Sequence, residues 1–181
     1  MANMKACGMK TFGMIGWSGS GKTTLIIQLI PELIGRGYSV SSMKHTHHNF
    51  DIDKPGKDSY EHRVAGAKQV LITGTKRWAL LNENRDQDES SIDDLLAKMD
   101  PVDLVLIEGF KKHPHSKMEV YRPSVERPLL ALEDKSVVAI ATDEQVEGGG
   151  LPVIDLNNVG AVADFIIEFC GLERRAVDGT A

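Results

Sequence analysis

The sequence is short of the features that define several classes of protein. Its 181 residues include only two cysteines, Cys7 and Cys170, which predict neither a disulfide framework nor a zinc site and suit a reducing compartment. No apolar run approaches the roughly 18 residues of a membrane span, and the N-terminus lacks the apolar core of a secretory signal. The net charge of −5 leaves no general basic excess for nucleic-acid binding. We therefore expect a cytoplasmic protein whose main partners are neither nucleic acid nor membrane.

A phosphate-binding loop is the clearest feature that the sequence does contain. Residues 16–23 fit the pattern G-x-x-x-x-G-K-[ST] at every fixed position. Glycines let successive backbone N–H groups point at one anion, and the following helix adds its positive N-terminal end. Lys22 can reach the β- and γ-phosphates, and the Thr23 hydroxyl suits Mg²⁺. The predicted phosphate contacts are Gly16, Ser18, Gly19, Ser20, Gly21, Lys22, Thr23 and Thr24.

The segments on either side of this loop support a nucleotide site. Residues 12–15 form an apolar run before the loop, and residues 23–34 are rich in apolar residues at helical spacing after it. Strand, loop and helix follow in the order that the pattern requires. An ordinary Gly-rich turn is the alternative. Pro31 is expected to kink this helix or to restart it.

The second informative stretch is the apolar run at 102–109, which resembles a Walker B strand because it ends in a carboxylate followed by glycine. Asp103 and Glu108 compete for the role at the metal. Five strand residues at ~3.3 Å each separate them by roughly 16 Å, and only the C-terminal end of a parallel strand faces a ligand. We therefore predict Thr23 and Glu108 on the metal side, and Lys22 and Glu108 as the catalytic pair. A strand-end glutamate on the surface is the alternative.

The order of the elements predicts the fold class. Strands that alternate with helices indicate a doubly wound α/β protein of the P-loop NTPase class, with a mostly parallel sheet and helices on both faces. Two short strands at 69–73 and 77–81, joined by a Gly-containing connection, predict a hairpin that makes the sheet mixed. Asp58, with Glu61 three residues on, is predicted as the N-cap of a helix through Ala67.

The choice of base rests on the residues after another apolar strand, at 136–141. A carboxylate there can accept hydrogen bonds from guanine N1–H and the exocyclic amino group, whereas adenine offers an acceptor at N1. Asp143 is therefore a candidate guanine reader, which favours GTP. A turn residue after a strand is the alternative reading of Asp143.

Several segments together resemble the MobB family of molybdopterin-guanine dinucleotide biosynthesis adaptor proteins. The resemblance extends from about Lys10 to Leu172. A phosphate-binding loop alone would be generic, but the segment rich in histidine and aspartate is typical of that family. The segments that carry the resemblance are 16–24, 44–48 with 51–59, 77–80 and 107–111.

This resemblance implies a cytoplasmic, homodimeric protein that binds GTP and Mg²⁺ and hydrolyses GTP only weakly. It implies that the protein assists a MobA-type guanylyltransferase, which attaches GMP to molybdopterin or the molybdenum cofactor, and that this cofactor is a possible ligand. By the same resemblance Glu108 lies on the metal side and Thr142 and Asp143 read guanine. The expected regions are a variable leader at 1–9, a single P-loop GTP-binding domain at 10–172 and a polar tail at 173–181.

The polar segment at 44–58 has no single interpretation. It contains three histidines and three aspartates, and His45, His47 and His48 could ligate a transition metal, contact a pterin phosphate or form a polar wall. Lys44, Lys57 and Arg63 favour an anion. The candidate cofactor contacts here are Lys44, His45, His48, Asp51, Asp53 and Lys57.

Three functions therefore remain open. The first is a GTP-binding adaptor that presents nucleotide or cofactor to a partner enzyme. The second is a P-loop small-molecule kinase in which Asp51 or Asp53 is the base for a hydroxyl acceptor. The third is a metallochaperone GTPase that uses the histidines at 45, 47 and 48.

Overall fold

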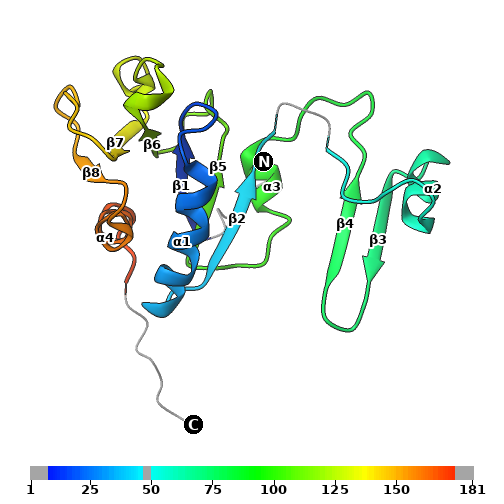
Figure 1. The fold of residues 1–181 in the computed structure, drawn as a ribbon. Helices are drawn as coiled ribbons and strands as arrows, with labels where there is room; N and C mark the ends of the chain where they lie inside the picture. The colour runs from blue at the N-terminus through cyan, green and yellow to red at the C-terminus, as the bar shows by residue number, and fades with distance from the viewer. Residues whose placement is uncertain (1–7, 47–49, 174–181) are drawn as a thin grey trace, which may run out of the picture. The chain divides into compact units, whose positions relative to one another are not determined.

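The computed structural model describes residues 8–46 and 50–173 (Figure 1). The chain divides into two compact units, one formed by Met1–His45 with Asp100–Ala181 and the other by Thr46–Met99. Most of the expected leader and tail lies outside the described residues, so the boundaries of leader, domain and tail stay predictions. Within residues 8–46 and 50–173, no helix has the length and apolar character that a membrane crossing needs.

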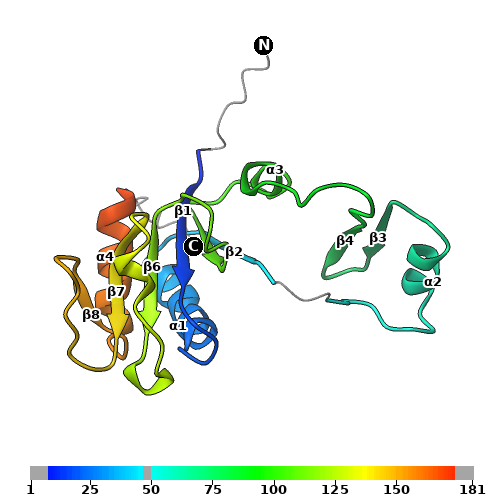
Figure 2. The ribbon, with the colours of Figure 1, turned by 90° about the horizontal axis from the view of Figure 1, so that it is seen from above.

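A six-stranded sheet with strand order β2-β5-β1-β6-β7-β8 forms the centre of the first unit. Every pairing between its described strands is parallel, and Figure 2 shows β1, β6 and β7 pointing the same way. Because β1 lies between β5 and β6, the loop that leaves β1 emerges at the middle of the sheet's C-terminal edge. The strands are β1 Lys10–Ile15, β2 Val40–Lys44, β5 Leu104–Glu108, β6 Lys117–Tyr121, β7 Val137–Thr142 and β8 Val153–Asp155.

Two helices pack together against one face of this sheet. They are α1, Lys22–Gly35, and α4, Val159–Cys170. Both bury an apolar stripe, and Phe12 on β1 meets the rings of two α4 phenylalanines edge-on. Helix α1 is continuous through Pro31, so the predicted restart does not occur. Leu29 and Leu33, which flank Pro31, are fully buried, and this packing outweighs the one lost backbone hydrogen bond.

Loops, rather than a helix, cover the opposite face over β6. Lys117 and Glu119 on this strand are fully buried. The Lys117 ammonium donates to the carbonyls of Lys111 and His113, at 2.9 and 2.6 Å. Glu119 accepts from the backbone N–H groups of residues 130 and 131. The expected helices are therefore found on one face of this unit, because the β5–β6 connection at 109–116 is too short to contain a crossover helix.

The second unit contains a hairpin and two short helices. The strands β3, Gln69–Thr73, and β4, Trp78–Asn82, pair antiparallel as predicted, and the helices are α2, Asp58–Val64, and α3, Ile92–Leu96. The hairpin forms a sheet of its own, so its predicted place in the larger sheet is wrong. A short turn makes β3 and β4 each other's nearest partners, and their ladder is complete without a third strand.

The start of α2 differs by one residue from the prediction. Lys57 is the N-cap and makes no side-chain capping bond, so Asp58 is the first helical residue and its assignment as the N-cap is wrong. Glu61 instead accepts a hydrogen bond from the Gly56 N–H at 3.3 Å. The tight turn at Gly56, with φ of 82°, places this N–H two positions before the predicted N-cap at Asp58.

Candidate functional site

The loop at 16–21 joins β1 to α1 and has the backbone of an anion site. Gly16 has φ of 146°, and a Cβ on it would lie 2.3 Å from the Val120 carbonyl oxygen, so only glycine fits there. Gly21 is the left-handed N-cap of α1 and provides no side-chain cap, and the first turn contains no acidic residue. The first N–H groups of a 14-residue helix are thus left to an external acceptor.

Lys22 lies against this loop. Its ammonium donates a 2.7 Å hydrogen bond to the carbonyl oxygen of Trp17. Partial burial lowers the pKa of Lys22 below its ordinary value, the Glu108 carboxylate opposes this shift, and the charges of Lys111 and Lys44 add to it. An anionic partner stabilises the charge of an ammonium that lies close to other cations. A phosphate oxygen can therefore replace the Trp17 carbonyl as the hydrogen-bond acceptor of Lys22.

The predicted metal pair lies together at the end of β5. The Thr23 hydroxyl donates to a Glu108 carboxylate oxygen at 2.7 Å, and the Lys44 ammonium lies 3.2 Å from the same oxygen. These are hard oxygen donors, and Mg²⁺ in proteins is commonly held by one or two such groups together with phosphates and water. Asp103 is at the other end of the strand, where it accepts from the Ser39 N–H and hydroxyl, and so has a structural role.

The candidate guanine readers follow β7, two strands away from β1. Asp143 forms an ion pair through one carboxylate oxygen with Arg122, which directly follows β6. The other oxygen, Oδ1, is buried and has no hydrogen-bond partner among the described residues. Thr142 is buried at the end of the strand. A cavity of about 320 Å³ opens between residues 142–145 and the segment of β8.

Arg122 is a site residue that the sequence alone did not reveal. Besides its contact with Asp143, its Nε donates to the carbonyl oxygen of Ser20 at 3.2 Å. One guanidinium therefore joins the phosphate-binding loop to the candidate base reader. A basic residue placed directly after the strand next to β1 is the signal that could have identified it.

Of the polar segment at 44–58, the first two residues belong to this edge of the sheet. The His45 N–H donates to the Glu108 carbonyl at 2.9 Å, and the His45 ring lies 4.4 Å from that of Phe110. His47 and His48 lie outside the described residues, so a metal-binding role for the histidines stays untested. Among residues 8–46 and 50–173, no three His, Cys, Asp or Glu side chains form a metal-binding group.

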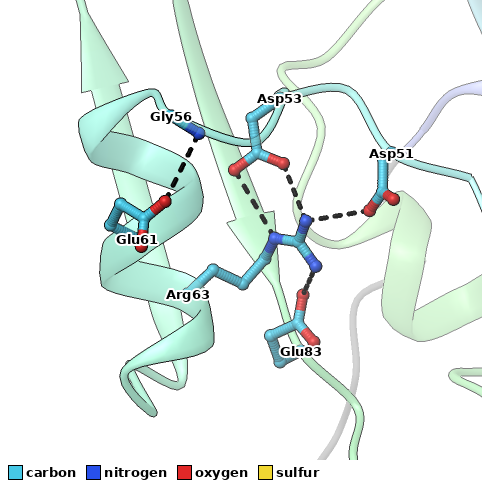
Figure 3. A network of polar contacts seen from close by, with 6 residues as sticks. All are labelled: Asp51, Asp53, Gly56, Glu61, Arg63 and Glu83. Atoms are coloured by element: carbon cyan, nitrogen blue, oxygen red, sulfur yellow. Dashed lines mark hydrogen bonds and ion pairs between the residues drawn. The ribbon is translucent and has the colours of Figure 1, made fainter.

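Asp51, Asp53 and Lys57 belong to the second unit. There the Arg63 guanidinium lies 2.8 Å from Asp51 and 2.9 Å from Asp53, and it also contacts Glu83 at 3.5 Å (Figure 3). The hydrogen bond to Asp53 is the largest of the effects that raise the pKa of Arg63. Both aspartates are thus paired with a cation, which does not suit the role of a free catalytic base.

These contacts border a cavity of about 720 Å³ within the second unit. Its lining combines the Arg63 cluster with apolar side chains from Phe50, Ile52 and Leu80. Lys57 is exposed at the start of α2. The candidate residues of the polar segment are therefore divided between two units, with Lys44 and His45 in the first and the other described ones in the second.

The first unit has the architecture of a P-loop NTPase-like protein. A glycine loop joins β1 to α1 in a parallel sheet, a lysine follows the loop at the start of α1, and a hydroxyl–carboxylate pair lies beside it. The chain belongs to the MobB family, because the model of MobB, molybdopterin guanine dinucleotide synthesis protein B, matches residues 11–143. The predicted P-loop NTPase class, with its mostly parallel sheet and flanking helices, and the predicted family are thereby confirmed.

Individual relatives agree with this assignment. The chain is 43% identical over 156 residues to the molybdopterin-guanine dinucleotide biosynthesis adapter protein of Escherichia coli (strain K12), a match that covers 84% of this chain and 89% of that protein. The protein of the same description from Haemophilus influenzae is also 43% identical, with 85% of each chain covered. The crystal structure of Bacillus subtilis MobB matches with a TM-score of 0.67 at 25% identity, over 92% of this chain and 100% of that one.

Proposed function

We propose that this chain is a GTP-binding adapter in molybdopterin guanine dinucleotide biosynthesis and that it assists a MobA-type guanylyltransferase. The observation that carries the proposal is the contact between Thr23 and Glu108 beside Lys22. It brings residues from the two informative stretches of the sequence to one point. The names of the relatives supply the pathway.

The phosphates of GTP would bind along the glycine loop. The Lys22 ammonium exchanges the Trp17 carbonyl for β- and γ-phosphate oxygens, and the uncapped N–H groups of α1 donate to the same anion. Thr23 and Glu108 would hold Mg²⁺, which supplies positive charge to the β- and γ-phosphates. Glu108 is bonded to Thr23 and paired with Lys44, an arrangement that suits metal binding better than activation of water. We therefore expect weak hydrolysis.

The guanine base would lie in the cavity beside Asp143. Oδ1 of Asp143 has no hydrogen-bond partner within residues 8–46 and 50–173, so it would accept from guanine N1–H or the guanine amino group, whereas the N1 of adenine is itself an acceptor. Arg122 holds the other oxygen and so orients the carboxylate. The preference for GTP over ATP follows from this difference in hydrogen bonding.

Further parts of the proposal rest on the resemblance to the family. They are a homodimer, a cytoplasmic location and molybdopterin or the molybdenum cofactor as a further ligand. Sedimentation of the full chain at micromolar concentration tests the first, and a monomer there would contradict it. Addition of the chain to a reconstituted guanylyl transfer reaction tests the assistance itself, with an increased yield of the dinucleotide as the expected result.

Calorimetric titration of the full chain with GTP and with ATP, in the presence of Mg²⁺, tests the nucleotide site. We expect tighter binding of GTP and a loss of that preference in Asp143→Ala. Equal affinity for the two nucleotides, or tighter binding of ATP, would contradict the proposal and would favour the small-molecule kinase.

A further inference from the structure

The second residue of the phosphate-binding loop, Trp17, is large and is held in place at two points. Its carbonyl oxygen accepts from the Lys22 ammonium at 2.7 Å, and its indole Nε1 donates to the Pro128 carbonyl at 2.8 Å. The ring is therefore fixed between the loop and the segment that follows β6. An indole fixed in this way offers a platform to other groups near the phosphate site.

Two cations lie over the Trp17 ring. The Lys111 ammonium is 4.5 Å from the ring centroid and the Arg127 guanidinium carbon is 5.5 Å from it, within the range of cation–π contacts. Among residues 8–46 and 50–173, Lys111 has no ion pair with a carboxylate. Apart from this contact, the Lys111 charge interacts with the Glu119 carboxylate, whose pKa burial raises and Lys111 lowers, but the two, both within the described residues, form no ion pair. The Lys111 ammonium is therefore available to a stronger partner.

The position of Lys111 is set by a buried contact. Its carbonyl oxygen accepts from the ammonium of Lys117, which is fully buried under the loop at 109–116. This loop directly follows Glu108, so Lys111 lies at the same edge of the sheet as the proposed metal site. The charge of Lys111 also lowers the pKa of Lys22, which indicates that the two ammonium groups are close.

We propose that Lys111 is a phosphate-binding residue whose ammonium moves from the face of Trp17 to the terminal phosphate of a bound nucleoside triphosphate. The terminal phosphate is favoured over the α-phosphate because Lys111 lies beyond Glu108 and beside Lys22, the residues that would contact the metal and the β- and γ-phosphates. The cation–π contact with Trp17 then keeps the Lys111 ammonium near the site before a nucleotide binds. This inference rests on the nucleotide binding proposed above.

Calorimetry of Lys111→Gln with GTP and GDP, each with Mg²⁺, tests the assignment. A lost charge-assisted contact is expected to weaken GTP binding by about tenfold and GDP binding by less. Lys112→Gln is the matched control, because it removes the same charge from the exposed neighbouring residue and should leave both affinities close to those of the unmodified chain.

Each contrary result has a separate meaning. Unchanged GTP affinity in Lys111→Gln, or an equal loss in Lys112→Gln, would overturn the role of Lys111 and leave the nucleotide site standing. Equal losses for GTP and GDP would overturn the contact with the terminal phosphate. Failure of the unmodified chain to bind GTP would instead overturn the proposed function, and with it the role of Lys111.

The fluorescence of Trp17 provides a second readout. The chain has two tryptophans, so Trp78→Phe leaves Trp17 as the only one. Departure of the ammonium from the ring should change the Trp17 emission when GTP is added. In the same background, Lys111→Gln should remove most of that change at saturating GTP. An undiminished change in the double variant would contradict the movement of Lys111.

Discussion

At the scale of single residues, the chemistry proposed for the site depends on charged side chains at the C-terminal ends of strands. Lys44 and Glu108 end β2 and β5, while Arg122 and Asp143 directly follow β6 and β7. Parallel strands end at the same edge of a sheet, so these side chains meet although they are far apart in the sequence. Each can be replaced without disturbing the apolar core on the α1 and α4 face.

Glu108→Gln keeps the shape of the side chain and removes its charge. We expect the affinity for GTP with Mg²⁺ to fall by about tenfold, because a neutral amide is a poorer metal ligand, while the affinity without Mg²⁺ changes little. Titration calorimetry with and without Mg²⁺ measures both values. Asp103→Asn, which likewise keeps the side-chain shape and an oxygen acceptor for Ser39 while removing the charge at the opposite end of the same strand, is the control for general charge effects. An equal loss with and without Mg²⁺ would argue against a metal-binding role for Glu108.

Arg122→Gln removes the cation that holds Asp143 and contacts the Ser20 carbonyl. We expect GTP affinity to fall by about tenfold and ATP affinity by less, because the base reader loses its orientation. Competition between the two nucleotides for the variant measures the preference. Lys135→Gln removes an exposed positive charge and should leave the preference intact. Parallel losses of GTP and ATP would indicate that Arg122 acts on the phosphates instead.

At the scale of elements, the loop at 109–116 replaces the helix that a parallel crossover usually contains. It covers the sheet through Lys117, whose ammonium binds two of its carbonyls, and through His115, which packs against Gly13. A Cβ on Gly13 would lie 2.3 Å from His115 Nε2, so the two residues are matched in size. The buried contacts of Lys117 and His115 therefore fix the loop that carries Lys111 beside the proposed phosphate site.

One of the two histidines in this loop, His115, is expected to make stability depend on pH. Burial, with the Lys117 charge as a further cause, lowers the pKa of His115 to about 4, below the ordinary value of 6.5. Between about pH 6.5 and pH 4 the unfolded chain thus binds a proton that the folded chain excludes, so this contribution to stability is lost as the pH falls. Urea unfolding should show a lower midpoint at pH 5 than at pH 7.

The variant His115→Asn should show a smaller change in the midpoint between these two pH values, since it has no imidazole to titrate. His62→Asn is the control, because it removes an exposed histidine from α2 and should leave the pH dependence unchanged. The same slope in His115→Asn as in the unmodified chain would show that other groups cause the loss of stability.

At the scale of the whole molecule, the phosphate-binding loop, Glu108, Arg122 and Asp143 all belong to the first unit. The second unit has its own charge cluster around Arg63 and its own cavity. The residues proposed here for the nucleotide site therefore come from the first unit.

Binding of GTP to the folded chain alone must raise its stability. At 100 times the dissociation constant, ligand linkage adds about 2.7 kcal/mol to the free energy of unfolding of the unit that binds. Thermal unfolding with GTP and Mg²⁺ should therefore shift to higher temperature, and Lys22→Ala should lose the shift while unfolding normally without nucleotide. Lys112→Ala should keep it. A full shift of the unfolding temperature in Lys22→Ala would show that Lys22 does not bind the nucleotide.

The parts of the candidate site that the sequence predicts are those formed by residues adjacent along the chain. The phosphate-binding loop is one run of residues, and the carboxylate of Glu108 ends an apolar strand that the pattern locates. Geometry along that strand also distinguishes Glu108 from Asp103, and the Thr23–Glu108 contact agrees with this choice. The pairing of Asp51 and Asp53 with Arg63 was not predicted, because it depends on how α2 faces the segment before it.

By itself the sequence determined the order of strands and helices, the family and the loop that would receive phosphate, because apolar periodicity and glycine spacing are local properties of the chain. Only the tertiary structure decided that Arg122 joins Asp143 to Ser20, that the hairpin forms a separate sheet and that Lys111 lies on Trp17. These contacts join residues distant along the chain. Their distances follow from strand order and loop packing, which no local pattern encodes.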